Sequence, residues 1–338
     1  MVNNISAIIT KNTNPYRNLA IEEHLTLDAK RGECVLFLWQ NEKSVVIGKN
    51  QNAYTECDTE RLEAEGGHLV RRLSGGGAVF HDLGNLNFTF CVREADYDIS
   101  RQCDVILEAV KELGIKATRT GRNDLTVDGK KFSGHAFYKK GDKCCHHGTI
   151  LMNIDTALLT RYLTPDRDKL TFKGVRSVSA RVCNLSDFIP GINADIISES
   201  LIRAFSKVYG LPVSEIPEGY LPEQEIKKKE LRFASRDFIY GENVSFSHRI
   251  KCRNSWGGAE ILLCVTDGFI TDLKVYSDCM DEELPVIISH LLKGSRYSLN
   301  EISERLRKGI EKYRFCCYHS DIKVIFEDII RIFGEKMR

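Results

Sequence analysis

The feature that most constrains the fold is a series of short strands and tight turns between residues 124 and 154. Asp128-Gly129 separates two β-type runs, residues 125–127 and 131–133, and an Asp-Gly pair between such runs is a strong signal for a two-residue hairpin turn. Gly141-Asp142 marks a second turn, after which the chain returns through residues 149–152. The segment therefore predicts consecutive antiparallel hairpins.

Strands and helices are predicted on both sides of these hairpins from apolar runs and from apolar residues at helical spacing. Ser100 is expected to cap a helix that ends at Gly114, and Gly210 is expected to end a helix over 194–209. Residues 216–229 contain two prolines and a lysine run, which predicts a surface excursion. The other predictions are strands at 33–39, 44–48, 68–72 and 86–92 and a helix at 59–65.

The pattern changes after about Ser247. Residues 259–265 and 269–275 flank Asp267-Gly268 and predict another hairpin. Helical patterns follow at 282–293, 299–314 and 319–333. A hairpin followed by helices is typical of a small α/β layer. We therefore predict an α/β (α+β) chain with two domains, residues 1–246 and 247–338.

Composition narrows the function classes. The formal net charge of +1 over 338 residues offers no global attraction to nucleic acid or to an anionic membrane. The 12 cysteines include no C-x-x-C pair and are scattered from Cys34 to Cys317, which indicates free thiols in a reducing compartment. The start of the chain lacks the pattern of a signal peptide, and no apolar stretch approaches the ~20 residues that span a bilayer. A cytoplasmic location is expected.

The first segment that indicates chemistry is residues 71–82, which read RRLSGGGAVFHD. Three successive glycines allow backbone to approach a ligand closely and to turn N–H groups toward an anion. Arg71 and Arg72 add fixed positive charge and planar donor groups that suit phosphate oxygens. The segment predicts a nucleotide cradle, although it matches neither a Walker loop nor a dinucleotide fingerprint. The alternative is a flexible turn between strands.

The second segment combines residues 121–124 with the hairpin that carries Lys130 and Lys131. Alternation along a strand places these two lysines on opposite faces, so one can point into a cleft. An ammonium group there could bridge a carboxylate and a phosphate. The alternative is that both lysines are solvated charges beside a turn, and that Asp124 caps its own loop.

The third segment, residues 143–149, places two cysteines beside two histidines. Neighbouring residues on a strand point to opposite faces and the usual ligand spacing is absent, so a zinc site made of these four residues is disfavoured. A cysteine nucleophile with a histidine base stays open as an alternative. It would make the protein an acyltransferase that works through a thioester.

Taken together, these segments resemble the lipoate–protein ligase A family. Residues 71–85, 121–125, 131–134 and 146–149 occur in that family's order and at closely similar separations. The resemblance extends to residues 18–23, 162–166, 173–178 and 256–260 and so covers nearly the whole chain.

The resemblance implies a biotin/lipoate ligase-like catalytic domain, related to class II aminoacyl-tRNA synthetase cores, with a small C-terminal accessory domain. It implies ATP-dependent conversion of lipoate to lipoyl-AMP with release of pyrophosphate. The lipoyl group is then transferred to a lysine of an acceptor domain, such as those of dehydrogenase E2 subunits or the glycine cleavage H protein. ATP and Mg²⁺ are the expected cofactors, no structural metal is expected, and the protein is expected to be a monomer.

The resemblance also assigns the site. Lys131 is expected to contact both the lipoyl carbonyl and the α-phosphate, and is the expected catalytic residue. His135 stands where relatives often carry a small or amide residue, and its side chain could alter the pocket if it reached it. The expected nucleotide contacts are Arg71, Arg72, Ser74, Gly75, Gly76, Gly77, Ala78, Val79, Phe80, Asn123, Asp124 and Lys131, and the expected lipoate contacts are Lys131, Gly75, His81 and His147.

Three alternatives to a lipoate–protein ligase remain. An octanoyl or lipoyl transferase of the same fold needs a cysteine near residues 121–124, which contain none; Cys144 and Cys145, in a predicted turn, are the only nearby substitutes. A biotin ligase would carry an arginine-glycine-rich adenylation loop that is missing here. A non-catalytic binding protein would need neither Lys131 nor the glycine loop. The accessory domain could act as a moving lid or could only cover an apolar edge.

Overall fold

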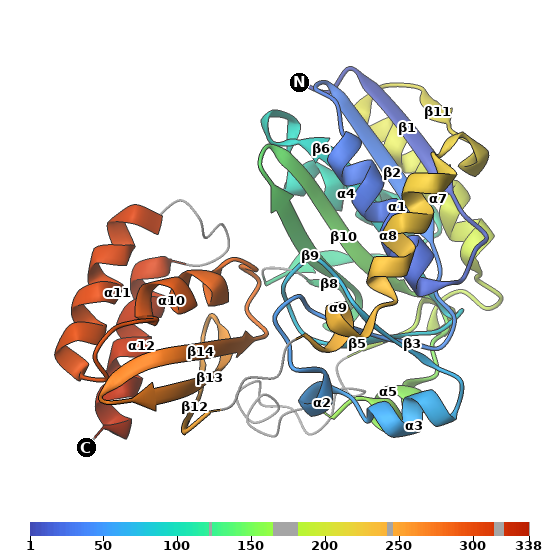
Figure 1. Ribbon diagram of the computed structural model, residues 1–338. Helices are drawn as coiled ribbons and strands as arrows, with labels where there is room; N and C mark the ends of the chain where they lie inside the picture. Colours follow the sequence, from blue (N-terminus) through green and yellow to red (C-terminus); the bar gives the residue numbers. More distant parts are fainter. Residues whose placement is uncertain (122–123, 165–181, 242–245, 314–320, 338) are drawn as a thin grey trace.

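An eight-stranded mixed sheet forms the centre of the larger, N-terminal part of the molecule (Figure 1). The computed structural model describes residues 1–121, 124–164, 182–241, 246–313 and 321–337. The pairs β11–β1 and β1–β2 are parallel and the other pairs are antiparallel. In spatial order the strands are β11 (Val213–Glu215), β1 (Asn4–Ile9), β2 (Glu33–Trp39), β6 (Asn85–Arg93), β10 (Lys143–Leu151), β9 (Lys130–Lys140), β8 (Asp124–Val127) and β7 (Thr118–Thr120).

Helices cover both faces of this sheet. On one face, α4 (Ile99–Glu112) and α7 (Ala194–Tyr209) bury apolar residues against Phe88 and Phe90 of β6. On the other face lie α1 (Pro15–Asp28) and α8 (Glu223–Phe233), which pack against each other (Figure 1). The alternation of β9 and β10 therefore sends successive side chains into two different cores.

A smaller sheet of three strands, in the order β4-β3-β5, lies beside the central one. It shares a core with four short helices. The chain between β4 and β5 is the glycine-rich segment, so this sheet fixes both ends of that loop. The strands are β3 (Ser44–Ile47), β4 (His68–Arg71) and β5 (Val79–His81), and the helices are α2 (Ala53–Glu56), α3 (Thr59–Ala64), α5 (Thr156–Tyr162) and α9 (Arg236–Tyr240).

The C-terminal part has a sheet and a core of its own (Figure 1). Three antiparallel strands pack their apolar face on three helices. The predicted boundary between residues 246 and 247 stays a prediction. The elements are β12 (His248–Asn254), β13 (Gly257–Thr266), β14 (Phe269–Ser277), α10 (Leu284–Leu292), α11 (Leu299–Tyr313) and α12 (Ile322–Lys336). Among the residues that the structure describes, short 3₁₀ turns are η1 (Glu94–Asp96), η3 (Leu185–Asp187) and η4 (Glu218–Tyr220).

The predicted turns are confirmed by backbone conformation. Asp128 and Gly129 have φ of 49° and 76°, which suits a tight hairpin turn between β8 and β9. Gly210 has φ of 64° and ends α7 in the left-handed conformation that glycine adopts at least cost. Among the described helices, none has the length and apolar character to cross a bilayer.

Three local predictions were wrong. Asp98, rather than Ser100, caps α4, because its side chain accepts the Arg101 N–H at 3.0 Å. The segment over 216–229 contains most of α8, whose Ile226 is fully buried and packs near α1. Cys144 and Cys145 lie inside strand β10 and not in a turn.

Candidate active site

A cavity of about 300 Å³ lies between the glycine-rich loop and strands β9 and β10. Its polar lining includes the cationic or imidazole side chains of Arg72, His81, Lys131 and His147 and the loop backbone; the other polar residues in the lining are Glu56, Asn87, His135, Thr149 and Thr164. Its apolar lining suits a hydrocarbon chain, and such a combination of apolar walls with a few polar groups is typical of ligand sites. The main apolar side chains in the lining are Leu19, Trp39, Val46, Phe80, Leu151, Ile154, Leu159 and Leu163.

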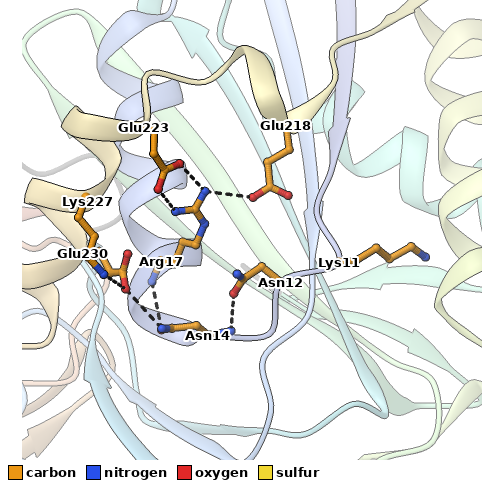
Figure 2. A pocket seen from close by; sticks show the side chains of 8 residues that line it. All are labelled: Lys11, Asn12, Asn14, Arg17, Glu218, Glu223, Lys227 and Glu230. Carbon is orange, nitrogen blue, oxygen red and sulfur yellow. Dashed lines mark hydrogen bonds and ion pairs between the residues drawn. The ribbon is translucent and has the colours of Figure 1, made fainter.

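A second hollow, near the start of α1, is an ion-pair cluster open to solvent (Figure 2). Arg17 donates to both carboxylate oxygens of Glu223, at 2.7 and 2.8 Å, and lies 3.4 Å from a Glu218 oxygen. Lys227 pairs with Glu230 at 3.1 Å. These charges neutralise one another, and no residue of the predicted site lies there. The cavity between the glycine-rich loop and strands β9 and β10 is therefore the candidate active site.

Arg72 holds the glycine-rich loop in shape from inside. Its Nε donates to Ser74 Oγ at 2.9 Å, and its Nη2 donates to the carbonyls of Gly75 at 2.6 Å and Gly77 at 2.9 Å. Gly76 has φ of +88°, a conformation that other residues rarely adopt. Burial lowers the pKa of Arg72 to about 10, so the guanidinium keeps its charge at neutral pH. The loop is thus an ordered structure with a positive charge at its base.

Arg71 points elsewhere. Its guanidinium donates to the carbonyls of Gln51 at 2.6 Å, Lys49 at 3.0 Å and Ile239 at 2.8 Å, and it does not line the cavity. Through these hydrogen bonds, Arg71 connects α9 to the small sheet. Its assignment to the nucleotide stays a prediction that the geometry does not favour.

Lys131 brings a flexible cation to the cavity wall. Its ammonium lies 2.7 Å from an Asp124 carboxylate oxygen, while the neighbouring Lys130 is exposed. Gly134 makes room for this side chain, because a Cβ built at that position would lie 2.5 Å from Lys131 Nζ. The expected separation of the two lysines onto opposite faces matches this arrangement.

A buried polar network supports His147. Its Nδ1 lies 2.7 Å from Glu22 Oε1 and its Nε2 lies 2.7 Å from Ser74 Oγ. Thr89 Oγ1 donates to the same Glu22 oxygen at 2.7 Å. This Ser–His–Glu order resembles a hydrolase triad, but Ser74 is fully buried, does not line the cavity and accepts from Arg72. The network therefore fixes the imidazole and the loop relative to each other.

Sequence reasoning missed Glu22 as part of this network. The helix α1 buries Glu22 and Glu23 at about 4% exposure each, and two buried carboxylates on one helix are a signal for buried polar partners. His81, which was predicted, is buried at the cavity and bonds to Asn41. Burial, with Arg72 and His147 adding to it, lowers the pKa of His81 to about 3, so the ring is neutral.

The remaining predicted residues fall into three groups. Gly76, Gly77, Ala78, Val79 and Phe80 line the cavity as expected of a nucleotide loop. Ser74, Gly75 and Asp124 lie next to lining residues without lining the cavity themselves. Asn123 lies outside the described residues, as do the predicted motif residues 173–178.

The C-terminal part closes one side of the cavity, although none of the predicted site residues belongs to this part. Met280 lines the cavity, and the Gly76 N–H donates to the Cys279 carbonyl at 2.9 Å. A Cβ built on Gly75 would lie 2.5 Å from that same carbonyl oxygen, so glycine is required for this close approach. The segment between β14 and α10 is therefore seated directly on the glycine-rich loop.

His135 is among the residues that line the cavity, next to Gly134 and Ala136. Its imidazole packs edge-on to Phe88 at 5.3 Å between ring centroids, in the core that α4 covers. Cys144 and Cys145 are also buried away from the described cavity lining, and burial raises the pKa of the Cys144 thiol to about 11. The transferase alternative therefore finds no nucleophilic thiol at the described part of the site.

Comparisons with known proteins identify the class to which this fold and site belong. The sequence matches the lipoyl protein ligase A/B catalytic domain over residues 14–206 and the bacterial lipoate protein ligase C-terminus over residues 243–332. The chain belongs to the lipoate-protein ligase family.

Individual relatives extend over most of the chain. A lipoate-protein ligase A of Bdellovibrio bacteriovorus is 38% identical over 309 residues, which are 89% of this chain and 91% of the relative. One of Psychrobacter cryohalolentis is 39% identical and covers 87% of this chain and 89% of its own length.

Solved structures of lipoate ligases superpose on this chain. LipL1 of P. falciparum in complex with lipoate superposes with a TM-score of 0.81 at 31% identity, over 97% of this chain and 99% of that one. A lipoate-protein ligase A bound with ATP gives 0.62 at 25% identity, over 71% and 99%. A bipartite ligase of Thermoplasma acidophilum, described with its E2 lipoyl domain, gives 0.63 at 25% identity, over 72% and 98%. The predicted lipoate-ligase fold is confirmed.

Proposed function

We propose that this protein activates lipoate with ATP and transfers the lipoyl group to a lysine of an acceptor domain. One observation carries the proposal: the Arg72-held glycine loop and the Lys131 ammonium meet at a single cavity whose other wall is apolar. An apolar acyl chain, a carboxylate and a nucleotide phosphate could share that cavity, each against matching chemistry.

The first step brings two anions together. The lipoate carboxylate oxygen attacks the α-phosphorus of ATP, the acyl–phosphate bond forms, and pyrophosphate leaves. Lys131, Arg72 and the N–H groups of the loop offset the negative charge that gathers around the reacting phosphorus. In the second step the acceptor amine attacks the activated carbonyl and AMP leaves with the former carboxylate oxygen.

Mg²⁺ would accompany the phosphates of ATP, since this ion prefers phosphate, carboxylate and water oxygens. Two described carboxylates fit this chemistry: Asp124, which lies 2.7 Å from Lys131 Nζ beside the cavity, and Glu56, which lines the cavity. An ion held there would add positive charge near the α-phosphate of the transferred adenylyl group.

The partners follow from the relatives. The ATP-bound and lipoate-bound structures support ATP and lipoate as substrates, and the Thermoplasma ligase supports an E2 lipoyl domain as acceptor. We extend this proposal to the glycine cleavage H protein, to action as a monomer and to a domain boundary at residues 246 and 247. A cytoplasmic location is proposed because all ten cysteines in the described part of the chain are free thiols.

The proposal is tested with an unmodified E2 lipoyl domain, lipoate and Mg²⁺, with and without ATP. Mass spectrometry of the acceptor is expected to show one lipoyl group added only when ATP is present. Transfer from an octanoylated carrier protein without ATP, and none with ATP and free lipoate, would establish the transferase alternative instead.

Replacing Gly134 with alanine is expected to lower the ligation rate by about 10- to 100-fold, since displacing a reacting group by about 1 Å can cost that much. The new Cβ would lie 2.5 Å from Lys131 Nζ and 2.6 Å from its Cε, so the ammonium must move. The far end of a lysine moves easily, so the midpoint of thermal unfolding is expected to change little. Gly219→Ala, in exposed 3₁₀ turn η4 with no atom within 4 Å of the new Cβ, is the matched control. Equal rates for the two variants would refute the steric argument.

A further inference from the structure

Three metal-ligating side chains meet on the far side of the central sheet from the cavity. Cys103 of α4, His135 of β9 and His146 of β10 place one ligand atom each within 4.8 Å of the other two. His135 Nδ1 lies 2.6 Å from His146 Nε2 and 3.8 Å from Cys103 Sγ. All three residues are buried. This set differs from the one that the sequence presented, because only His146 belongs to the Cys-Cys-His-His run.

The two histidines are oriented by partners on their other ring nitrogens. His146 Nδ1 lies 3.0 Å from Gln102 Oε1, an acceptor, so this nitrogen carries the proton and Nε2 offers its lone pair to the cluster. His135 Nε2 lies 3.1 Å from Ser133 Oγ, which can either donate or accept. Such outer partners are what fixes ring orientation and tautomer in metal sites.

The surroundings are apolar and closed. The rings of Phe88 and Phe137 lie 5.5 and 4.9 Å from the His146 ring, and His135 and His146 stack at 4.8 Å.

We propose that Cys103, His135 and His146 form a structural site for one thiophilic d¹⁰ metal ion, Zn²⁺ or Cu⁺. Thiolate and imidazole are the ligands that such ions prefer. Tetrahedral geometry at ordinary Zn–N and Zn–S lengths requires roughly 3.3 Å between nitrogens and roughly 3.5 Å between sulfur and nitrogen. The two distances from His135 Nδ1, 2.6 and 3.8 Å, differ from these by less than an ångström. Cys103 Sγ lies within 4.8 Å of His146 Nε2, so the cysteine side chain must also move closer to His146 for all three atoms to bind one ion.

The proton balance of binding is simple. Without an ion, Ser133 donates to His135 Nε2, and the His135 Nδ1 proton is shared with His146 Nε2. On binding, the His135 proton moves to Nε2, the Ser133 hydroxyl turns to accept it, and the Cys103 thiol releases one proton as the metal–sulfur bond forms. The thiolate offsets one positive charge, so a bound Cu⁺ leaves the ligand set neutral.

The site would clamp α4 to the β9–β10 hairpin. The opposite face of that hairpin carries His147 of the candidate active site, and Lys131 lies on the same strand as His135. An ion would therefore stiffen the sheet directly behind the cavity without contacting a substrate. The inference does not depend on the proposed function, because its readout is metal binding.

The experiment uses the full-length protein after removal of metals with a chelator. Zn²⁺, or Cu⁺ under reducing conditions, is titrated against a chromophoric competitor, and bound ion is counted by elemental mass spectrometry. One equivalent is expected for the wild type, and the preferred ion decides between the two members of the class. Co²⁺ as a spectroscopic probe is expected to give a thiolate charge-transfer band.

Cys103→Ser and His135→Asn are expected to lose at least about 100-fold in affinity, since removal of an outer partner alone typically costs 10- to 100-fold. Cys34→Ser is the matched control, because Cys34 is a buried cysteine that does not belong to the cluster. Circular dichroism checks that each variant is folded, and the Co²⁺ band reports the ligand directly in any variant with altered stability. Absence of a stoichiometric ion, or equal affinity and an equal Co²⁺ band in Cys103→Ser and Cys34→Ser, would overturn the proposal.

Discussion

Replacing Lys131 with alanine is expected to lower the rate of lipoyl-adenylate formation by about 10²–10³-fold, equivalent to about 2.7–4 kcal/mol of transition-state stabilisation. The ammonium reaches the cavity where the two anionic reactants must meet, and its place is kept open by Gly134. Removing it leaves Asp124, its ion-pair partner at 2.7 Å, as an added negative charge beside the reaction. The rate is measured by lipoate-dependent release of pyrophosphate, without acceptor.

Lys130→Ala is the control for this variant. Lys130 is adjacent in the chain and exposed, so its removal changes the protein's net charge equally without reaching the cavity. Its rate is expected to stay close to that of the wild type. If Lys131→Ala adenylated as fast as Lys130→Ala, the role assigned to Lys131 would be wrong.

The second large effect concerns the contact between the two parts of the chain and its dependence on pH. Glu282 lies in the segment that seats on the glycine loop, and its carboxylate accepts the Lys139 N–H at 3.3 Å. Burial raises the pKa of Glu282 from 4.5 to about 7. Lys49 opposes this shift and Glu283 adds to it. We call the arrangement in which the segment between β14 and α10 contacts the glycine-rich loop the seated state. This state therefore favours the protonated form of the Glu282 carboxyl.

The sign follows from linkage. Protonation stabilises the seated state fully below the ordinary pKa of 4.5, and the contribution is lost as the pH rises to about 7. A shift of that size corresponds to about 3 kcal/mol, so the contact is expected to be much weaker at pH 8 than at pH 5. Hydrogen-exchange protection factors of the Gly76 and Ser277 amides, which bond across the contact, measure it after correction for intrinsic exchange.

Glu282→Gln separates this effect from general pH dependence. The amide keeps an acceptor oxygen and cannot titrate, so protection is expected to stay high from pH 5 to 8. Glu283→Gln removes an exposed carboxylate that pairs with Lys49 at 2.7 Å, and it is expected to retain most of the wild-type pH dependence. Identical profiles for wild type and Glu282→Gln would show that this carboxyl does not control the contact.

Local signals in the sequence predicted much of the fold. The turn at Asp128-Gly129 and the end of α7 at Gly210 depend on backbone conformations that few residues adopt, so the residue type itself is informative. The helix α8 was missed for the opposite reason. Its neighbourhood contains Pro217 and Pro222, and among its residues only Ile226 and Phe233 are buried, so its apolar face is too narrow to stand out.

The site was predicted mainly through resemblance, and its supporting contacts were not predicted at all. Glu22 and His147 are 125 residues apart in the chain, and Gly76 and Cys279 are farther still. Such contacts depend on how layers pack and leave no periodic trace in the sequence. For Arg71 the local sequence pattern was misleading. An arginine beside a glycine loop suggests phosphate binding, but in the structure its guanidinium donates to backbone carbonyls.

The burial of the cysteines has a consequence for the substrate itself. Lipoate carries a strained ring disulfide, which thiolates open by exchange. No cysteine belongs to the described lining of the cavity, and of the cysteines in the described ranges eight are buried. Burial raises the pKa of the Cys279 thiol, next to Met280, to about 12, so its thiolate is scarce at neutral pH. Although the chain contains many cysteines, it can thus bind oxidised lipoate and transfer it without forming a mixed disulfide with it.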